Sequence, residues 1–385
     1  MTLLKDPQII TSDEDLRKLC IHLSTQTKVA VDLEGDSLHH FKEKLCLLQV
    51  SDDTADYIVD VLTISDFSPM KEILEDARIL KVMHGADYDV VSLKRDYDCE
   101  INSLFDTALA AQFLNYEKWG LANLIQKHFG LTLEKRYQKH DWSRRPLYWE
   151  HIDYARMDTH YLLAVHEIMQ IQLKRKGLLE ACIEESICLT RREWNGRRFD
   201  GEDFLRVKKV HTLSSESLKV LRTLYEARDE WAQKRDVPVF HYATDGVLFG
   251  IAQKIPSDRQ SLQESVQAKY VGVVSKKSDE LLRLVEQGKL DTRPLPKVGR
   301  SNVKRRKNRW LNEIVNRLRE WRTVQNESGT HLFLLPTNNQ IKELAFEVPT
   351  SQTDLESLGI LRRWQVTLWG DVVLETIQKV VEPAV

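Results

Sequence analysis

The chain has 385 residues, and at about 150 residues per domain this length predicts two or three domains and excludes a single small binding module. Hydrophobic residues make up 42% of the chain, which is enough for full cores, but no run of about 18 apolar residues is present to cross a bilayer. The net charge of −2 conceals an acidic half, about −8 over residues 1–200, and a basic half, about +6 over residues 201–385.

The N-terminal segment, MTLLKDPQIITSDEDL, has no basic region, no apolar stretch and no small-residue cleavage site. It does not look like a secretory signal peptide, so the expected location is cytoplasmic. We expect neither membrane association nor an obligate protein partner.

The next part of the chain alternates short apolar runs with helical patterns. Apolar runs predict strands at residues 29–33, 45–50, 57–59 and 79–83. A helical period is present between residues 66 and 78 and again at about residues 87–94. Three strands, a helix, a strand and a helix indicate an α/β core.

Residues 107–192 have a helical period almost throughout. The polar, proline-containing stretch HDWSRRP at residues 140–146 interrupts it and predicts a loop. The first domain is therefore expected to end near Arg198 and to span residues 1–198.

Two helical domains are predicted in the second half, at residues 211–291 and 292–385. Residues 293–309 contain eight Lys or Arg and no acid, which indicates a basic linker leading into a helix. The motifs RDEW, VP, LFGIA and IP of the second domain are echoed by EWR, LP, IKELA and VP in the third. We interpret the two domains as a diverged internal repeat.

The cysteines are odd in number and widely spaced, and they form no C-x-x-C pair. This pattern argues against a disulfide framework and against a zinc site. Reduced and mostly buried thiols are expected at Cys20, Cys46, Cys99, Cys182 and Cys188.

Two carboxylates stand at the end of the first predicted strand. Asp32 and Glu34 are two residues apart, so the period of a strand places both on one face. A solvated strand end and a cation-binding pair are equally good readings of these two residues alone.

Two further segments carry polar groups in patterns that suit a shared site. Tyr154 and Asp158 are four residues apart in a predicted helix and therefore share a face. In KVMHGADYD, residues 81–89, a buried strand leads through glycine into the first turn of a helix with Asp87 and Asp89. Acids in a first helical turn also complement the helix dipole, so this segment alone does not indicate a functional site.

In order and spacing, the three segments together resemble the Exo I, Exo II and Exo III motifs of the DEDD family of 3'-to-5' exonucleases, in the subclass with Tyr in the third motif. Within that family the resemblance is greatest to the ribonuclease D group, and it extends through DSLHH, EKLCLLQ, FDT, DW and RPL. The second domain resembles the helicase and RNase D C-terminal (HRDC) domain, and the third its divergent second copy. The resemblance implies an α/β ribonuclease H-like exonuclease core with a mixed sheet, followed by two all-α HRDC-type domains.

Carried over position by position, the resemblance implies five catalytic residues. Tyr154 would orient the attacking water, and the metal ligands would be Asp32, Glu34, Asp89 and Asp158. Asp87 competes with Asp89, but the acid of the family lies five residues after the histidine, and His84 to Asp89 fits that spacing.

Asp106 matches a further acid of the family. Its residue type and position suit a structural hydrogen bond better than metal ligation.

Four converging carboxylates suit the hydrolysis of a phosphodiester. Two Mg²⁺ or Mn²⁺ ions about 4 Å apart can activate a water and stabilise the leaving 3'-oxygen. Such hard cations prefer oxygen ligands. Without cations the carboxylates repel each other and some pKa values rise, so metal binding and the order of the site are coupled.

The implied activity is that of a metal-dependent 3'-to-5' exoribonuclease, which releases 5'-mononucleotides from a free 3'-hydroxyl. The implied partners are tRNA precursors and other small structured RNAs. A DNA 3'-to-5' exonuclease is the nearest alternative, and a nucleic-acid-binding HRDC accessory protein is another. The chain has no G-x-x-x-x-G-K-[ST] phosphate loop, which excludes a helicase ATPase of the P-loop type.

Further residues are candidates for substrate contacts. His39, His40 and Lys44 follow the first motif and would touch substrate phosphates or the terminal nucleotide, although an exposed turn is an equally good reading. The run Lys304, Arg305, Arg306 and Lys307 would bind the RNA backbone, or else be a solvated helix face. Aromatic side chains that would stack on bases, unless they serve only in packing, are Tyr88, Trp119, Trp142 and Trp149.

Overall fold

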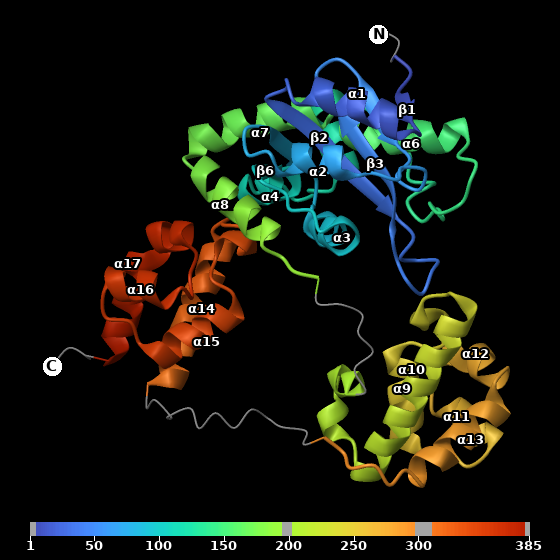
Figure 1. Ribbon diagram of the computed structural model, residues 1–385. Coiled ribbons are helices and arrows are strands. Elements are labelled where there is room, and N and C mark those ends of the chain that lie inside the picture. Colours follow the sequence, from blue (N-terminus) through green and yellow to red (C-terminus); the bar gives the residue numbers. More distant parts are fainter. Residues whose placement is uncertain (1–4, 195–201, 297–309, 382–385) are drawn as a thin grey trace.

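The computed structural model describes residues 5–194, 202–296 and 310–381, and the first of these ranges is built around a six-stranded sheet (Figure 1). The strand order is β1-β4-β3-β2-β5-β6, with the antiparallel pairs β2–β3 and β3–β4 in the middle and parallel pairs outside them. This confirms the predicted mixed sheet. The strands are β1 Gln8–Ile10, β2 Lys28–Gly35, β3 Leu45–Ser51, β4 Asp56–Val59, β5 Leu80–Met83 and β6 Leu104–Asp106.

Helices cover both faces of this sheet, and the alternation of β2 fits that arrangement. Val29 and Val31 belong to the apolar cluster that β2 shares with α1, α2 and α3, whereas Ala30 packs against α7 on the opposite face. The helices of this domain are α1 Asp13–Leu23, α2 Ser68–Glu75, α3 Asp87–Tyr97, α4 Thr107–Phe113, α5 Leu121–Phe129, α6 Trp149–His160, α7 Leu162–Lys176 and α8 Leu179–Thr190.

The loop predicted at residues 140–146 is present, and Arg145 fixes it against the sheet. The Arg145 guanidinium donates to both carboxylate oxygens of Asp60, at 2.5 and 2.6 Å, and to the carbonyl oxygen of Trp142 at 2.8 Å. Trp142 itself is 1% exposed and belongs to the apolar cluster that includes Ile152 and Ala155 of α6.

The second half of the chain is helical, and no strand occurs in residues 202–296 and 310–381. Its α-helices are α9 Ser215–Arg235, α10 Asp245–Lys254, α11 Arg259–Glu264, α12 Val271–Ser275, α13 Ser278–Lys289, α14 Leu311–Glu327, α15 Asn338–Glu347, α16 Gln352–Leu358 and α17 Arg363–Val381. Short 3₁₀ turns are η1 Asp203–Arg206, η2 Val210–Thr212, η3 Val239–His241, η4 Ala268–Tyr270 and η5 Leu332–Leu334.

The two helical units end corresponding helices in the same way. Ile255 after α10 and Val348 after α15 both have a left-handed backbone, with φ of 48° and 53°, and each is followed by proline. The next helix then begins at a side-chain cap, Asp258 for α11 and Ser351 for α16. These shared features support the interpretation as a diverged repeat. The predicted boundary at Arg198 falls outside the described residues, and the domain limits stay predictions.

Both helical units contact the sheet domain (Figure 1). The Asp236 carboxylate, just after α9, accepts from the backbone N–H of Phe41 at 3.1 Å and lies 2.7 Å from His40 Nδ1, in the loop between β2 and β3. At the end of α4, Trp364 and Phe333 of the last unit pack edge-on against Phe113, with ring centroids 5.1 and 5.2 Å away. The sheet domain and the helical units are therefore in contact at two separate places.

All five cysteines are unpaired, and all but the partly exposed Cys188 are buried, as expected. Among the helices in the described ranges, none combines the length and the apolar character needed to cross a membrane.

Candidate active site

Strand β2 delivers two acids to one face of the sheet. Asp32 and Glu34 continue the alternation that points Ala30 toward α7, so both side chains lie on the face covered by α6 and α7. The β2–β3 pairing then shifts register between Glu34 and Gly35. Bulges of this kind often re-aim side chains beside active sites.

Helix α6 delivers the third acid. Ile152 and Ala155 pack with Leu47 and Ile58 of the sheet, so this side of the helix is held against β3 and β4. One residue after Asp158, the Thr159 hydroxyl lies 2.7 Å from the Ser51 hydroxyl and fixes the register between helix and strand. Asp158 is thereby directed toward the acids of β2.

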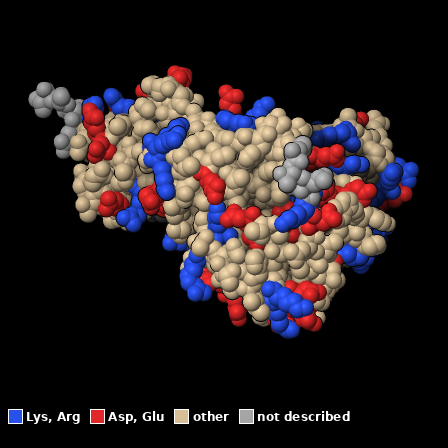
Figure 2. All heavy atoms as spheres, turned by 90° about the horizontal axis from the view of Figure 1, so that it is seen from above, with Lys and Arg blue, Asp and Glu red and all other residues tan. Residues whose placement is uncertain are grey.

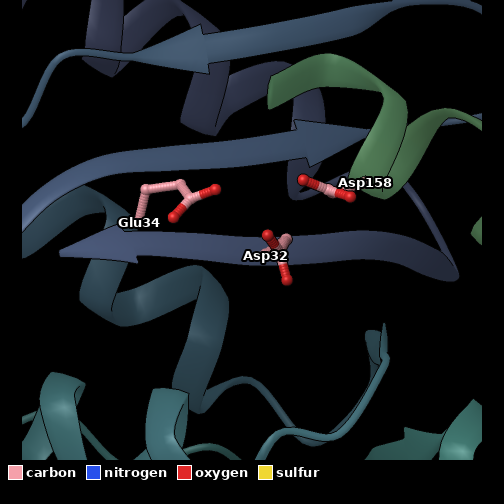
Figure 3. A group of neighbouring side chains, drawn as sticks. All are labelled: Asp32, Glu34 and Asp158. Carbon is pink, nitrogen blue, oxygen red and sulfur yellow. The ribbon is translucent and has the colours of Figure 1, made fainter. Parts of the chain in front are cut away.

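The three acids meet at one point. One carboxylate oxygen from each of Asp32, Glu34 and Asp158 lies within 4.8 Å of the other two, and Figure 3 shows the side chains directed into the same space. They line a cleft of about 360 Å³ together with Tyr154 and His84. All ligand atoms here are oxygens, which is the donor set that Mg²⁺ and Mn²⁺ prefer.

The environment of these carboxylates opposes their ionisation. Burial, followed by the charges of Asp158 and Asp89, raises the pKa of Asp32 and of Glu34 well above the ordinary range. Burial also raises the pKa of Asp158 to about 7. Because each shift disfavours the charged form, the cluster is stabilised by a bound cation, and cation binding expels protons from it.

Asp89 lies at the edge of this cluster and not among the three acids that meet. Burial raises its pKa to about 8, with further contributions from Asp106, Asp87 and Asp158. Electrostatically Asp89 therefore belongs to the same group of acids, because its charge also acts on Asp32 and Glu34. A metal-ligating role for Asp89 stays a prediction.

Asp87 and Asp106 have other partners. The Asp87 carboxylate pairs with Arg192 at 2.6 Å and is half exposed. Asp106 is fully buried and accepts from four backbone N–H groups at 2.7 to 3.1 Å, those of Gly85, Ala86, Ala108 and Leu109. This is the structural hydrogen bonding expected for Asp106, and it holds the turn that leads to Asp89.

Tyr154 is half-buried one turn before Asp158 on α6. Burial, followed by the charges of Asp158, Glu34 and Asp32, raises the pKa of its phenol above the ordinary value, so the phenol keeps its proton. The buried Trp142 indole stacks on the Tyr154 ring, with centroids 6.1 Å apart and ring planes at 28°. Trp142 therefore packs under the site, which is the packing role and not the alternative of stacking on bases.

The weaker substrate candidates do not line the cleft. His39 Nε2 lies 3.0 Å from the Lys139 carbonyl oxygen, and His40 is held between Ser143 and Asp236. Lys44 donates its backbone N–H to the Asp36 carboxylate at 2.7 Å. Substrate contacts by His39, His40 and Lys44 stay predictions. Lys304, Arg305, Arg306 and Lys307 lie outside the described residues.

One wall of the cleft was missed by sequence reasoning. It comes from the start of α5 and from the loop that follows this helix, where no motif marks a site. His84 was used only to count the spacing to Asp89, yet it lines the cleft and its Nδ1 lies 2.9 Å from the Thr107 hydroxyl. The lining residues of the missed wall include Gly120, Asn123, Glu134, Lys135 and Gln138.

Comparison with known families assigns two parts of the chain. Residues 7–174 match the family described as 3'-5' exonuclease, and residues 217–285 match the HRDC domain. The first match contains all four predicted metal ligands and Tyr154.

Comparison with single proteins agrees with these matches. The chain is 33% identical over 263 residues to exosome complex component 10 of Rattus norvegicus, covering 66% of this chain and 30% of that protein. The catalytic core of RRP6 from Trypanosoma brucei is 29% identical with a TM-score of 0.62, over 75% of this chain and 81% of that one. Escherichia coli RNase D shares the fold, with a TM-score of 0.68 at 23% identity, over 97% and 99% of the two chains. The chain thus spans under a third of the length of the rat protein.

Proposed function

Because the chain carries a DEDD-family 3'-5' exonuclease domain followed by an HRDC domain, we propose that it is a 3'-5' exoribonuclease of the ribonuclease D type. It hydrolyses RNA from the 3'-hydroxyl end and releases 5'-mononucleotides. The observation that carries this proposal is the meeting of Asp32, Glu34 and Asp158 in a cleft.

The carboxylates fit a pair of divalent cations. Asp32, Glu34, Asp89 and Asp158 would hold two Mg²⁺ or Mn²⁺ ions, which supply an activated water and charge stabilisation for the leaving oxygen. Because burial raises the pKa values of these acids, they would release protons when they bind the cations.

Tyr154 and His84 have roles that follow from their protonation. A phenol that keeps its proton cannot act as a base at neutral pH, so Tyr154 orients the attacking water by a hydrogen bond. Burial lowers the pKa of His84, so its ring is neutral and its position is fixed by the hydroxyl of Thr107.

RNA is the proposed substrate, and tRNA precursors and other small structured RNAs are the proposed physiological ones. Escherichia coli RNase D, which shares the fold, is described as an exoribonuclease involved in structured RNA processing, which supports this choice. Figure 2 shows Lys and Arg interspersed with Asp and Glu on the face seen there, without an extended patch of one sign among the described residues. We therefore assign phosphate binding to the basic linker and not to that face.

The test uses the full-length protein with Mn²⁺ or Mg²⁺ and matched RNA and DNA strands labelled at the 3' end. We expect labelled mononucleotide from RNA at the earliest times, and none with Asp158→Asn. Equal or faster release from DNA would overturn the RNA assignment in favour of the DNA exonuclease. Absence of release from either strand by a protein that binds both would favour a binding module.

A further inference from the structure

Gln49 is a buried amide beside the acids that no part of the proposed mechanism uses. It lies in the middle of β3 with 0% of the residue exposed. Neither its Nε2 nor its Oε1 has a hydrogen-bond partner within the described parts of the chain.

The register of the sheet fixes where this amide lies. Gln49 pairs with Asp32 across the antiparallel β2–β3 ladder, and directly paired residues project from the same face. Two residues before it, Leu47 packs with α6, and two residues after it, Ser51 meets Thr159 of α6. The Gln49 side chain is therefore enclosed between Asp32 and the stretch of α6 that carries Asp158.

A buried amide without hydrogen-bond partners lowers the stability of the fold, so its presence calls for a functional reason. A buried amide without partners loses its hydrogen bonds to water, and native proteins leave few such groups. At this place in the strand a leucine or isoleucine would fill the space without that cost, as Leu47 and Ile58 do beside it. An amide at this position is useful if it supports a group in the acid cluster.

We propose that Gln49 is a positioning residue for the metal-holding carboxylates: its amide donates, directly or through one water, to the carboxylate of Asp32 or Asp158 in the metal-loaded site. The N–H donor favours the ionised carboxylate and restricts its orientation, so the acids bind cations more tightly. This inference rests on the proposed function, because it assumes that these acids hold a divalent cation.

The experiment compares Gln49→Leu with the unchanged full-length protein. Mn²⁺ affinity is measured by isothermal titration calorimetry, and thermal melting is measured in chelator. We expect Mn²⁺ affinity to fall about 10- to 100-fold, as for other residues that orient metal ligands. We expect the melting temperature of the metal-free variant to be unchanged or higher, because an unpaired buried amide has been replaced by an apolar side chain.

His166→Phe is the matched control, since both ring nitrogens of the buried His166 also lack partners among the described residues. It lies edge-on against Phe105, and Asp32, Glu34, Asp89 and Asp158 are not among the groups that shift its pKa. Its Mn²⁺ affinity should equal that of the unchanged protein.

Mn²⁺ affinity within twofold of normal in Gln49→Leu would overturn the inference, and Gln49→Met repeats the test if Gln49→Leu does not fold. A lower metal-free melting temperature with normal affinity would make the amide a structural group. No Mn²⁺ binding by the unchanged protein would instead refute the proposed function.

Discussion

Two acids in the first turn of α3 have very different surroundings. Asp89 is 8% exposed and its pKa is raised toward 8, whereas Asp87 is half exposed and paired with Arg192. If Asp89 holds a cation, Asp89→Ala should lower the rate of nucleotide release by about 10³-fold or more while the protein stays folded. Asp87→Ala should stay within about threefold of normal.

The measurement is single-turnover digestion of a labelled RNA, with circular dichroism as the check on folding. A folded Asp89→Ala protein with near-normal activity would refute the assignment. The cation ligand would then have to be Asp87.

Tyr154 is predicted to act on the water and not on RNA binding. Tyr154→Phe keeps the ring that stacks on Trp142 and removes only the hydroxyl. The rate should therefore fall by roughly 10²-fold, because the hydroxyl that orients the attacking water is lost, with RNA affinity unchanged. Rate and affinity are measured separately on the same RNA, and a parallel loss of both would make Tyr154 a substrate contact.

At the scale of the element, α17 depends on another helix for its start. Glu184 of α8 accepts from the backbone N–H groups of Arg363 and Trp364, at 3.0 and 3.2 Å. Its neighbour Glu185 accepts from the Trp364 indole at 2.9 Å. A carboxylate on the first N–H groups of a helix both caps it and complements its dipole.

Glu184→Ala should therefore destabilise the contact between α8 and α17 by about 1 kcal/mol, the usual loss for a helix cap. Amide hydrogen exchange of the first turn of α17 should become faster. The matched control is Glu180→Ala, because Glu180 is an exposed acid of the same helix. Equal exchange rates in the two variants would show that the cap contributes nothing.

Features that depend on neighbouring residues could be predicted from the sequence, whereas contacts between residues far apart in the chain could not. The local periods predicted β2 to β5, and the resemblance of three segments to exonuclease motifs implied the acids that meet. Strands β1 and β6, with three residues each, are too short for a period to be visible. The contact of His40 with Asp236, 196 residues later, has no local signal at all. Gln49 looked like one more residue of a buried strand, since only the register shows that it faces Asp32.

At the scale of the whole molecule, the contacts between the sheet domain and the last helical unit affect how RNA binding can be tested. A chain that ends at residue 198 would lose Trp364 and Phe333, which cover Phe113. It would expose an apolar patch, so a loss of RNA affinity would be ambiguous. The basic linker should instead be changed within the full-length chain.

Replacing Lys304, Arg305, Arg306 and Lys307 together with Gln should weaken the binding of a tRNA precursor. The plot of log affinity against log salt should also become shallower, by about 0.7 to 0.9 for each phosphate contact removed. The control replaces Arg17 and Lys18 of α1, on the face of the sheet away from the acids. An unchanged slope in the linker variant would mean that the linker does not bind RNA phosphates.

The carboxylate of Asp106 joins two segments that the chain separates by some twenty residues: the turn before α3 and the start of α4. In a survey of random substitutions scored by loss of activity, changes at Asp106 would therefore lower activity as much as changes at a residue that touches the scissile bond. Its loss would release the turn that carries Asp89 and leave four amides without an acceptor. A residue that is required for activity therefore need not take part in the reaction. Asp106 is the residue for which a survey of inactive variants would fail to make this distinction.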